Sequence, residues 1–202
     1  MLVSGDCIFI QTPENKNVLI DGGDNKSDVL VPYLLDKRVK KIDYMLVSHF
    51  DSDHSNGLIK VIEKIEVDNI IISKQCEESQ EFIEFMKAVC KKKISIIEAE
   101  KGKRIYFDKY VHIDVLYPDK NLKFEDLNNN SIVAKLNYNN FSILFTGDIG
   151  IKAEEEILKK YDTDVLMSTV IKIAHHGSAD SSSISFLKAV NPEIALIGVR
   201  KE

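Results

Sequence analysis

Four short apolar runs in this sequence each end abruptly in a turn that carries carboxylate or imidazole side chains. The runs with their turns are Val18–Asp21, Met45–His54, Phe141–Asp148 and Val170–His176. Each run is short and continuously apolar, which favours a strand buried in a sheet. A scaffold that gathers strand ends along one edge of its sheets would bring these turns together. The pattern therefore predicts a sheet-based fold with a polar site at one edge.

The densest of these turns follows Met45–Val47 and holds His49, Asp51, Asp53 and His54 within six residues. Imidazole nitrogens mixed with carboxylate oxygens suit zinc, iron or manganese. We expect this segment to be extended, so that His49, Asp51 and Asp53 share a face and His54 reaches them from a turn. That geometry favours two adjacent ions. The alternative is a polar loop in which the two aspartates cap the next helix.

Strands interspersed with helices, with hairpins in both halves, predict a mixed sheet sandwich faced by helices. The predicted strands are Cys7–Gln11, Asn17–Asp21, Ile42–Val47, Asn69–Ser73, Ile94–Ile97, Arg104–Phe107, Val111–Tyr117, Ser131–Tyr138, Phe141–Thr146, Val170–Ala174 and Ile194–Gly198. The predicted helices are Asp28–Lys37, Leu58–Lys64, Glu77–Lys93, Glu154–Tyr161 and Ile184–Val190. Gly57 would permit a sharp turn before the second helix.

Composition sets limits on the class of protein. A chain of 202 residues with 44% hydrophobic and 29% charged residues is ordinary for a soluble globular protein. The formal charge of -5 argues against a surface that coats nucleic acid in general. A nucleic-acid substrate stays open, because a metal centre can supply local positive charge.

Cysteine usage and the N-terminus bear on localisation. Cys7, Cys76 and Cys90 are odd in number and far apart, as in a reduced, intracellular setting. No basic region precedes an apolar core at the N-terminus, so no signal peptide is visible. No apolar run approaches the ~20 residues needed to cross a bilayer. We expect a cytoplasmic protein or a soluble domain, which could be a piece of something larger, with no membrane segment.

Two of the turns are ambiguous when each is taken alone. Asp148 alone would be a helix cap or turn former, and His175–His176 alone would be a surface pair. Because four strand ends share one pattern, a common metal centre is the better interpretation.

The motifs of these turns also carry a family resemblance. Leu19–Gly23, Ser48–Gly57, Thr146–Asp148 and Ala174–Ser178 fall in the order and approximate spacing of metallo-β-lactamase fold hydrolases. Within that superfamily the chain looks most like the hydrolase domain of ComEC-type competence proteins, which are associated with DNA uptake. The features that fit this subgroup are Gly5-Asp6, Asn130-Ser131, Lys172 and Ser181–Ser183. The resemblance covers nearly the whole chain. It implies a single domain over residues 1–202, with an α+β fold in a four-layer αββα sandwich and a metal centre at one edge.

The resemblance also implies roles for individual residues. His49 and Asp51 would hold a first ion and Asp53 and His54 a second, with Asp148 bridging the two and His175 or His176 completing the second site. Asp21 would orient a ligand by accepting its hydrogen bond. Asn130, Ser131 and Ser178 would stand around these ligands.

This sequence departs from the family pattern at the first site. Asp51 stands where the superfamily usually has a histidine. The superfamily also usually has a further histidine between the motifs that correspond to Ser48–Gly57 and Thr146–Asp148, and that histidine is missing here. The intervening His112 lies within a predicted strand, as a structural residue would. A site richer in oxygen favours Mn²⁺ or weakly held Zn²⁺, as one ion or two.

The expected reaction is hydrolysis by a metal-bound hydroxide hydrogen-bonded to Asp53, with Lys172, His176 or Ser178 acting beside it. The preferred function is a phosphodiesterase of nuclease type that acts on single-stranded DNA or a nucleotide. One alternative is hydrolysis of a thioester, lactone or lactam, because the same nucleophile serves either electrophile. Another is a non-catalytic binding module that kept the fold.

Overall fold

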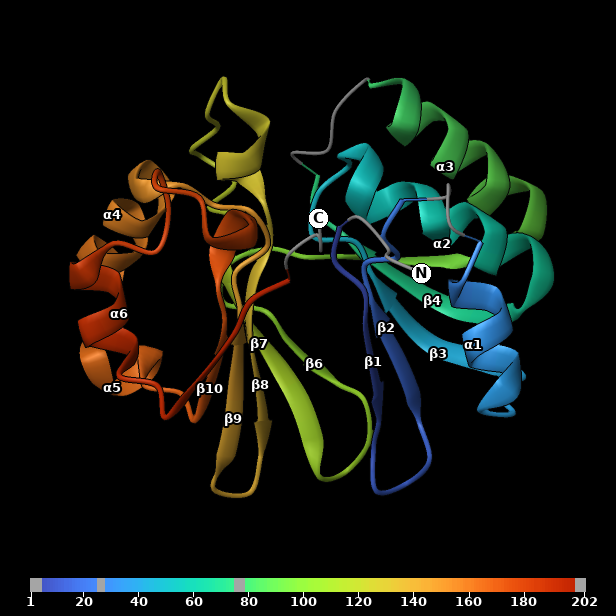
Figure 1. The fold of residues 1–202 in the computed structure, drawn as a ribbon, viewed down its shortest axis with the longest axis horizontal. Helices are drawn as coiled ribbons and strands as arrows, with labels where there is room; N and C mark the ends of the chain where they lie inside the picture. The colour runs from blue at the N-terminus through green and yellow to red at the C-terminus, as the bar shows by residue number, and fades with distance from the viewer. Residues whose placement is uncertain (1–4, 25–27, 75–78, 199–202) are drawn as a thin grey trace. The chain divides into compact units, whose positions relative to one another are not determined.

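The computed structural model describes residues 5–24, 28–74 and 79–198. Within these residues the chain forms two compact units, each built on one sheet. The first unit comprises residues 5–24, 28–72 and 79–98, and the second comprises residues 73–74 and 99–198. Both sheets are mixed and both carry helices (Figure 1), as predicted from the sequence.

The first unit is a five-stranded sheet in the order β1-β2-β3-β4-β5. Its elements are β1 (Ile8–Gln11), β2 (Asn17–Ile20), α1 (Leu30–Asp36), β3 (Lys41–Leu46), α2 (Ser52–Lys64), β4 (Glu66–Ile72), α3 (Gln80–Lys92) and β5 (Ser95–Glu98). β1 and β2 form the predicted antiparallel hairpin. From β2 to β5 each strand pairs in parallel with the next, since a helix returns the chain between them.

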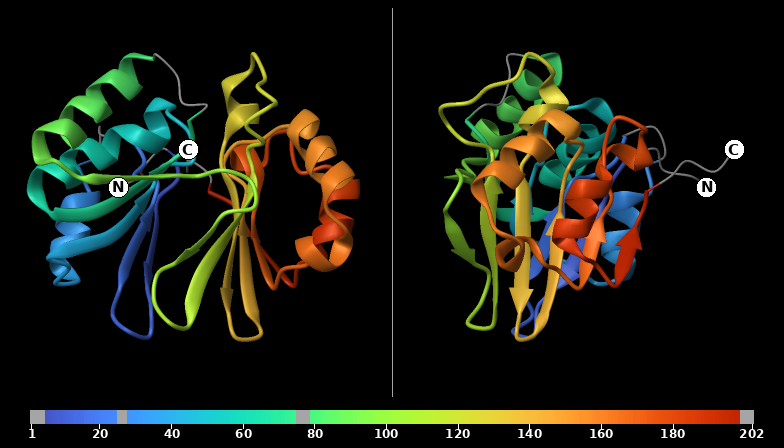
Figure 2. Two further views of the ribbon diagram at one scale, coloured as in Figure 1. Left: turned by 180° about the vertical axis from the view of Figure 1, so that it is seen from behind. Right: turned by 90° about the vertical axis from the view of Figure 1, so that its left-hand side faces the viewer.

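The helices of the first unit lie together on one side of its sheet (Figures 1 and 2). The apolar faces of α2 and α3 bury Leu58, Val61, Phe85 and Val89 in one core with strand residues such as Met45. The spacing of Phe85 and Val89 is that of one helical face, which is why the sequence predicted this helix. Its predicted start at Glu77 lies outside the described residues, as does Cys76.

The segment Ser48–Gly57, which carries four of the predicted metal ligands, is helical from Ser52. The prediction of an extended segment followed by a helix from Leu58 is therefore wrong. Asp51 stands at the N-cap position, and its carbonyl accepts the N–H of His54 at 3.0 Å and of Ser55 at 2.9 Å. Gly57 therefore lies inside α2 and makes no sharp turn. A Cβ placed on Gly57 would lie 1.9 Å from the Gly22 carbonyl oxygen. Glycine is required here because the helix touches the loop after β2 backbone to backbone.

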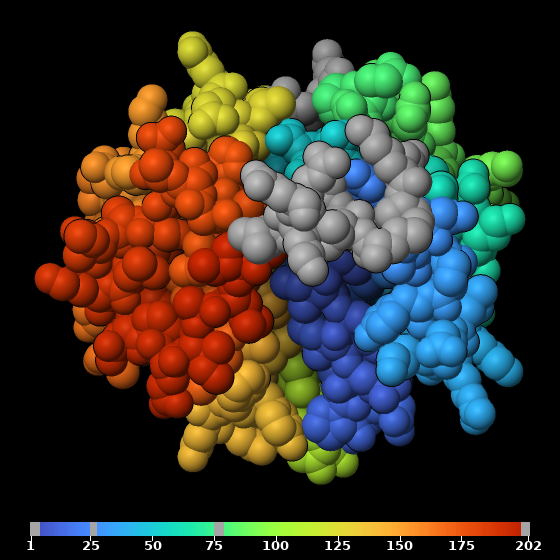
Figure 3. Space-filling model, in the orientation of Figure 1, coloured from blue at the N-terminus to red at the C-terminus, as the bar shows by residue number. Residues whose placement is uncertain are grey.

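The second unit is a six-stranded sheet in the order β11-β10-β9-β8-β7-β6. Its elements are β6 (Arg104–Tyr106), β7 (Val111–Tyr117), η1 (Leu127–Asn130), β8 (Val133–Tyr138), β9 (Phe141–Phe145), α4 (Ile151–Lys160), α5 (Thr163–Leu166), β10 (Val170–Lys172), η2 (Ala174–Gly177), α6 (Ile184–Val190) and β11 (Ile194–Leu196). Strands β6 to β9 are antiparallel, and β9, β10 and β11 are parallel. Helices α4, α5 and α6 lie on one side of this sheet (Figures 1 and 2), and the red part of the chain, which includes α6 and β11, is exposed on the face shown in Figure 3.

Boundaries in the second unit differ from prediction where distant side chains decide them. Helix α4 begins at Ile151, not at Glu154, because the Asn129 side chain accepts the N–H of Gly150 at 3.0 Å and of Ala153 at 3.3 Å. β10 ends at Lys172 because a 3₁₀ turn starts at Ala174. The predicted range Ile184–Val190 is confirmed as α6.

Within the described ranges, no helix has both the length and the apolar character required to cross a membrane.

Candidate metal centre

Asp21 ties together three strand and helix ends of the first unit. Its carboxylate accepts the Ser48 N–H at 2.8 Å and the Ser48 hydroxyl at 2.7 Å, and it lies 2.9 Å from His54 Nδ1. The Asp21 backbone is in the left-handed region, with φ of +54°, and its N–H donates to the Leu46 carbonyl at 2.9 Å. A non-glycine residue held there is strained, which is characteristic of functional sites. The end of β2, the end of β3 and the start of α2 are thus locked to one buried carboxylate.

These bonds fix which ring nitrogen of each histidine in the first unit acts as the hydrogen-bond donor. Asp21 accepts only, so His54 donates from Nδ1, and in the neutral ring the lone pair is then on Nε2. The Ser48 hydroxyl donates to Asp21 and therefore accepts from His49 Nδ1, 3.0 Å away. His49 Nε2 is buried and has no hydrogen-bond partner among the described residues. The centroids of the two rings are 4.2 Å apart.

The aspartates near these rings differ in their surroundings. An Asp51 carboxylate oxygen lies 3.7 Å from His49 Nε2, beyond hydrogen-bond distance. Asp53 lies in the first turn of α2 and is half-buried. Asp6, which the sequence marked only as part of the subgroup feature Gly5-Asp6 and not as a site residue, is buried, and one of its oxygens lies within 4.8 Å of a ring nitrogen of His54. The sequence feature that could have pointed to Asp6 is the preceding Gly5. A Cβ on Gly5 would lie 1.6 Å from the Asp53 carbonyl oxygen, so glycine allows this segment to contact α2.

The second unit holds its own cluster around Asp148, at the end of β9. Asp148 is buried, and its Oδ2 lies 3.5 Å from His176 Nε2. His176 Nδ1 donates to the Gly198 carbonyl at 3.0 Å, so Nε2 is the ring nitrogen that faces Asp148. On the other side, the buried Lys172 ammonium lies 3.4 Å from Asp148 Oδ1 and donates to the Gly147 carbonyl at 3.0 Å. Of the two adjacent histidines, His176 is the one in contact with Asp148.

Other predicted residues of the second unit support the loops. The Ser131 hydroxyl accepts the Asp148 N–H at 3.2 Å. Asn130 bonds to both backbone groups of Phe124, and the Ser178 hydroxyl accepts the Asp180 N–H at 3.4 Å, so these two side chains serve their own loops. His112 lies on β7, 3.6 Å from Asp114.

The loop that bears His176 is held by a residue that sequence reasoning missed. The fully buried Glu154 carboxylate of α4 accepts the backbone N–H groups of Ser182 and Ser183. The Ser181 hydroxyl donates to the Ala174 carbonyl at 3.0 Å, and Ser183 caps α6. His175 and His176 both have left-handed backbones, with φ of +47° and +52°. The surrounding bonds are needed to hold so strained a turn.

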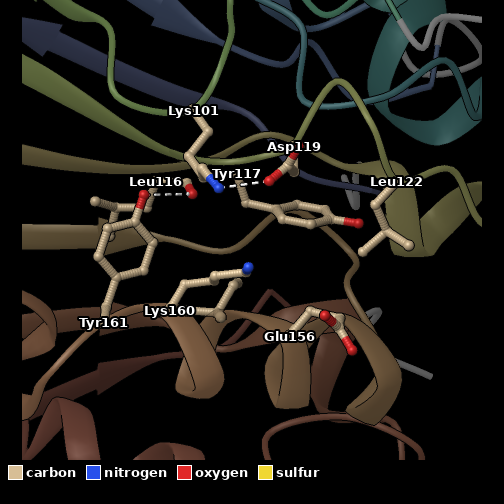
Figure 4. A pocket seen from close by; sticks show the side chains of 9 residues that line it. Lys101, Leu116, Tyr117, Asp119, Leu122, Glu156, Lys160 and Tyr161 are labelled. Atoms are coloured by element: carbon tan, nitrogen blue, oxygen red, sulfur yellow. Dashed lines mark hydrogen bonds and ion pairs between the residues drawn. The ribbon is translucent and has the colours of Figure 1, made fainter.

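A small pocket in the second unit lies apart from these residues (Figure 4). It is lined by Lys101, Leu116, Tyr117, Asp119, Leu122, Glu156, Ile157, Lys160 and Tyr161. Lys101 pairs with Asp119, and the Tyr161 hydroxyl donates to the Leu116 carbonyl at 3.0 Å. The polar groups of Lys101, Asp119 and Tyr161 thus have partners within the pocket lining, and none of the site residues predicted from the sequence lines this pocket.

The side chains of both clusters fit a divalent transition metal. Each of His49, His54 and His176 has Nδ1 in a hydrogen bond, which is the usual arrangement of a histidine that binds metal through Nε2. Carboxylates accompany the rings in each unit. Imidazole and carboxylate together suit zinc or manganese.

This combination of two mixed sheets, strand-end histidines and buried carboxylates defines a metallohydrolase fold. The family model of the metallo-β-lactamase superfamily matches residues 2–199, and the chain belongs to that superfamily. The resemblance drawn from the sequence motifs is confirmed, as are the fold class and the assignment to a family of hydrolases. The assignment of residues 1–202 to a single domain stays a prediction.

Two curated relatives are competence proteins. The chain is 25% identical over 215 residues to ComE operon protein 3 of Bacillus subtilis (strain 168), covering 98% of this chain and 27% of that protein. It is 31% identical over 194 residues to Competence protein ComA of Neisseria gonorrhoeae, covering 95% of this chain and 25% of that protein. The chain thus spans about a quarter of the length of these relatives.

Among solved structures, the chain is similar to Igni18, a metallo hydrolase from the archaeon Ignicoccus hospitalis KIN4/I. The TM-score is 0.61 at 14% identity, covering 96% of this chain and 79% of that one. At this identity the likeness establishes the fold alone.

Proposed function

We propose that this chain is a metal-dependent phosphodiesterase that acts on nucleic acid or a nucleotide, with Mn²⁺ or Zn²⁺ as its cofactor. The observation that carries the proposal is the fixed state of three histidines, each tied through Nδ1 and each with a carboxylate near its ring. The names of the competence relatives, together with the DNA uptake that the family resemblance implies, favour a nucleic-acid substrate.

The proposed ligands come from both units. His54 and Asp6 from the first unit and Asp148 and His176 from the second would hold the ion, with His49, Asp51 and Asp53 beside them. His176 is preferred to His175 because its Nε2 faces Asp148 at 3.5 Å. A divalent ion bound there supplies Lewis-acid polarisation of a phosphoryl oxygen and lowers the pKa of water.

The chain's own residues have distinct proposed tasks. Asp21 keeps the His54 ring oriented through its 2.9 Å contact, and Ser48 does the same for His49. Asp53, half-buried at the start of α2, is the proposed acceptor for the proton of the attacking water. The proposed task of the buried Lys172 is to position Asp148, in place of the contact with the phosphoryl group expected from the sequence, while Ser131 holds the Asp148 backbone.

Comparison of substrates tests this function. The purified chain, stripped of metal and reloaded with Mn²⁺ or Zn²⁺, would be incubated with single-stranded DNA, bis(p-nitrophenyl) phosphate, a thioester and a lactone. We expect cleavage of the two phosphodiesters only, and only with metal.

Cleavage of the thioester or lactone alone would move the function to carbonyl hydrolysis. Metal binding without turnover of any of the four compounds would favour the non-catalytic binding module. A matched control is Asp43→Asn. Asp43 is a buried carboxylate of the first unit, on β3, and it accepts hydrogen bonds from the Lys16 ammonium and the Asn17 N–H. This variant should keep the activity, so that loss of activity in site variants is not a general effect of removing a buried charge.

A further inference from the structure

The two oxygens of Asp148 have different partners, and this difference bears on how many ions the protein holds. Oδ2 faces His176 Nε2 at 3.5 Å, whereas Oδ1 faces the Lys172 ammonium at 3.4 Å. Both side chains of the Asp148–Lys172 pair are nearly inaccessible to solvent, at 4% and 6% exposure. From this asymmetry we infer that the protein binds one divalent ion per chain, and that the Lys172 ammonium takes the place of a second.

The position of Lys172 is built into the fold. The residue ends β10, which pairs in parallel with β9, the strand that leads to Asp148. The Thr146 hydroxyl donates to the Lys172 carbonyl at 2.6 Å, and the Lys172 ammonium returns a bond to the Gly147 carbonyl at 3.0 Å. Two adjacent strand ends thus fix the ammonium beside Asp148, and the buried stem has little room to move it elsewhere.

Charge then decides between one ion and two. A carboxylate that bridges two dications needs its negative charge for both of them. Here part of that charge is already neutralised by an ammonium that is buried, where repulsion between cations is poorly screened. A second dication at Asp148 would stand close to the Lys172 ammonium and be repelled by it. One ion on the Oδ2 side, next to His176, avoids that repulsion.

The inference agrees with the unusual composition of the other proposed position. Asp51, whose carboxylate lies 3.7 Å from His49 Nε2, is about half exposed at its side chain. A half-exposed carboxylate must give up part of its hydration before it can bind an ion, and this cost weakens it as a ligand. His49 and Asp51 are then a polar pair beside the bound ion rather than ligands of a second ion. This differs from the bridging role for Asp148 that the family resemblance implies.

The number of bound ions is directly measurable, and the inference rests on the proposed function only in requiring that metal binds. Metal-free protein would be titrated with Mn²⁺, with bound metal counted by mass spectrometry after gel filtration and characterised by electron paramagnetic resonance. We expect one Mn²⁺ per chain at saturation, with the six-line spectrum of an isolated ion. Two ions per chain, or a spin-coupled spectrum, would overturn the inference and leave the proposed function standing. No bound ion would overturn both.

A pair of lysine variants tests the cause. Lys172→Met removes the ammonium but keeps an apolar stem, so we expect the count to rise from one Mn²⁺ towards two. Lys135→Met is the matched control, because Lys135 also donates to two backbone carbonyls, those of Val165 and Met167, on another part of the same sheet. The control should stay at one ion. A folded Lys172→Met protein that also stays at one would show that Lys172 does not exclude the second ion, and if this variant does not fold, the count for the unaltered protein decides.

Discussion

Replacing Asp148 by Asn is expected to abolish hydrolysis and to lower metal content while the chain stays folded. Asp148 is the buried carboxylate at the end of β9, in contact with His176 on one side and Lys172 on the other. The Asn side chain is neutral, so it offers a far weaker ligand to a dication. Changes to groups that only support metal ligands cost ~10–100-fold. Loss of a ligand should exceed about 100-fold in kcat/KM, measured on bis(p-nitrophenyl) phosphate with metal in excess.

The fold should survive Asp148→Asn because the amide oxygen of Asn still accepts from the Lys172 ammonium. Removing one member of a buried ion pair typically costs about 3–5 kcal/mol, and the remaining bond of Lys172 to the Gly147 carbonyl reduces that cost. Circular dichroism should show unchanged secondary structure and a lowered Tm. Full activity with normal metal content in this variant would count decisively against Asp148 as a ligand.

Gly57→Ala is expected to cost more than about 4 kcal/mol of unfolding free energy, or to prevent folding. In an ordinary helix the same change stabilises by about 1 kcal/mol, because alanine loses less backbone entropy than glycine. Here the added Cβ would stand 1.9 Å from the Gly22 carbonyl oxygen. The Gly57 N–H also donates to the Gly23 carbonyl at 2.9 Å, so the helix cannot withdraw without breaking that bond.

Urea unfolding of Gly57→Ala and Gly102→Ala separates the effect of the clash with Gly22 from the general effect of replacing a glycine by alanine. A Cβ placed on Gly102, which has a φ of +88°, would have no described atom within 4 Å beyond its chain neighbours. Its replacement should cost only about 1–2 kcal/mol, the strain of alanine in the left-handed region. If Gly57→Ala proved as stable as the unaltered chain, the close approach of α2 to the loop after β2 would be wrong.

Much of the fold was predictable because its signals are local. The apolar runs that end in Asp21, His49 and Asp148 are strands in the structure, and the spacing of Phe85 and Val89 marks α3. These features depend on residues close in sequence, whose periodicity a single chain displays. The parallel and antiparallel parts of the sheets follow from where helices or tight turns join the strands.

Features that depend on distant residues were not predictable in this way. The start of α4 depends on the Asn129 side chain, more than twenty residues earlier, and the place of Gly57 inside α2 depends on the close approach of the Gly22 carbonyl. Asp6 and Glu154 were missed for the same reason. Their burial beside His54 and beneath the loop that bears His176 is a property of the packed units and leaves no periodic pattern in the sequence.

The choice between His175 and His176 also required atomic detail. The two histidines are adjacent in the chain and both have left-handed backbones, so nothing in the sequence distinguishes one from the other as a ligand. The bond from His176 Nδ1 to the Gly198 carbonyl and the 3.5 Å distance from its Nε2 to Asp148 show which ring faces that carboxylate.

The proposed function depends above all on histidine and carboxylate groups from both units binding the same ion. Anomalous diffraction from crystals grown with Mn²⁺ or Zn²⁺ locates the metal independently of any assumed ligand. We expect a peak within about 2.0–2.2 Å of both His54 Nε2 and an Asp148 oxygen, the usual length of such bonds. A peak whose ligands all come from one unit, or a saturated crystal without a peak at these residues, would be incompatible with a shared ion.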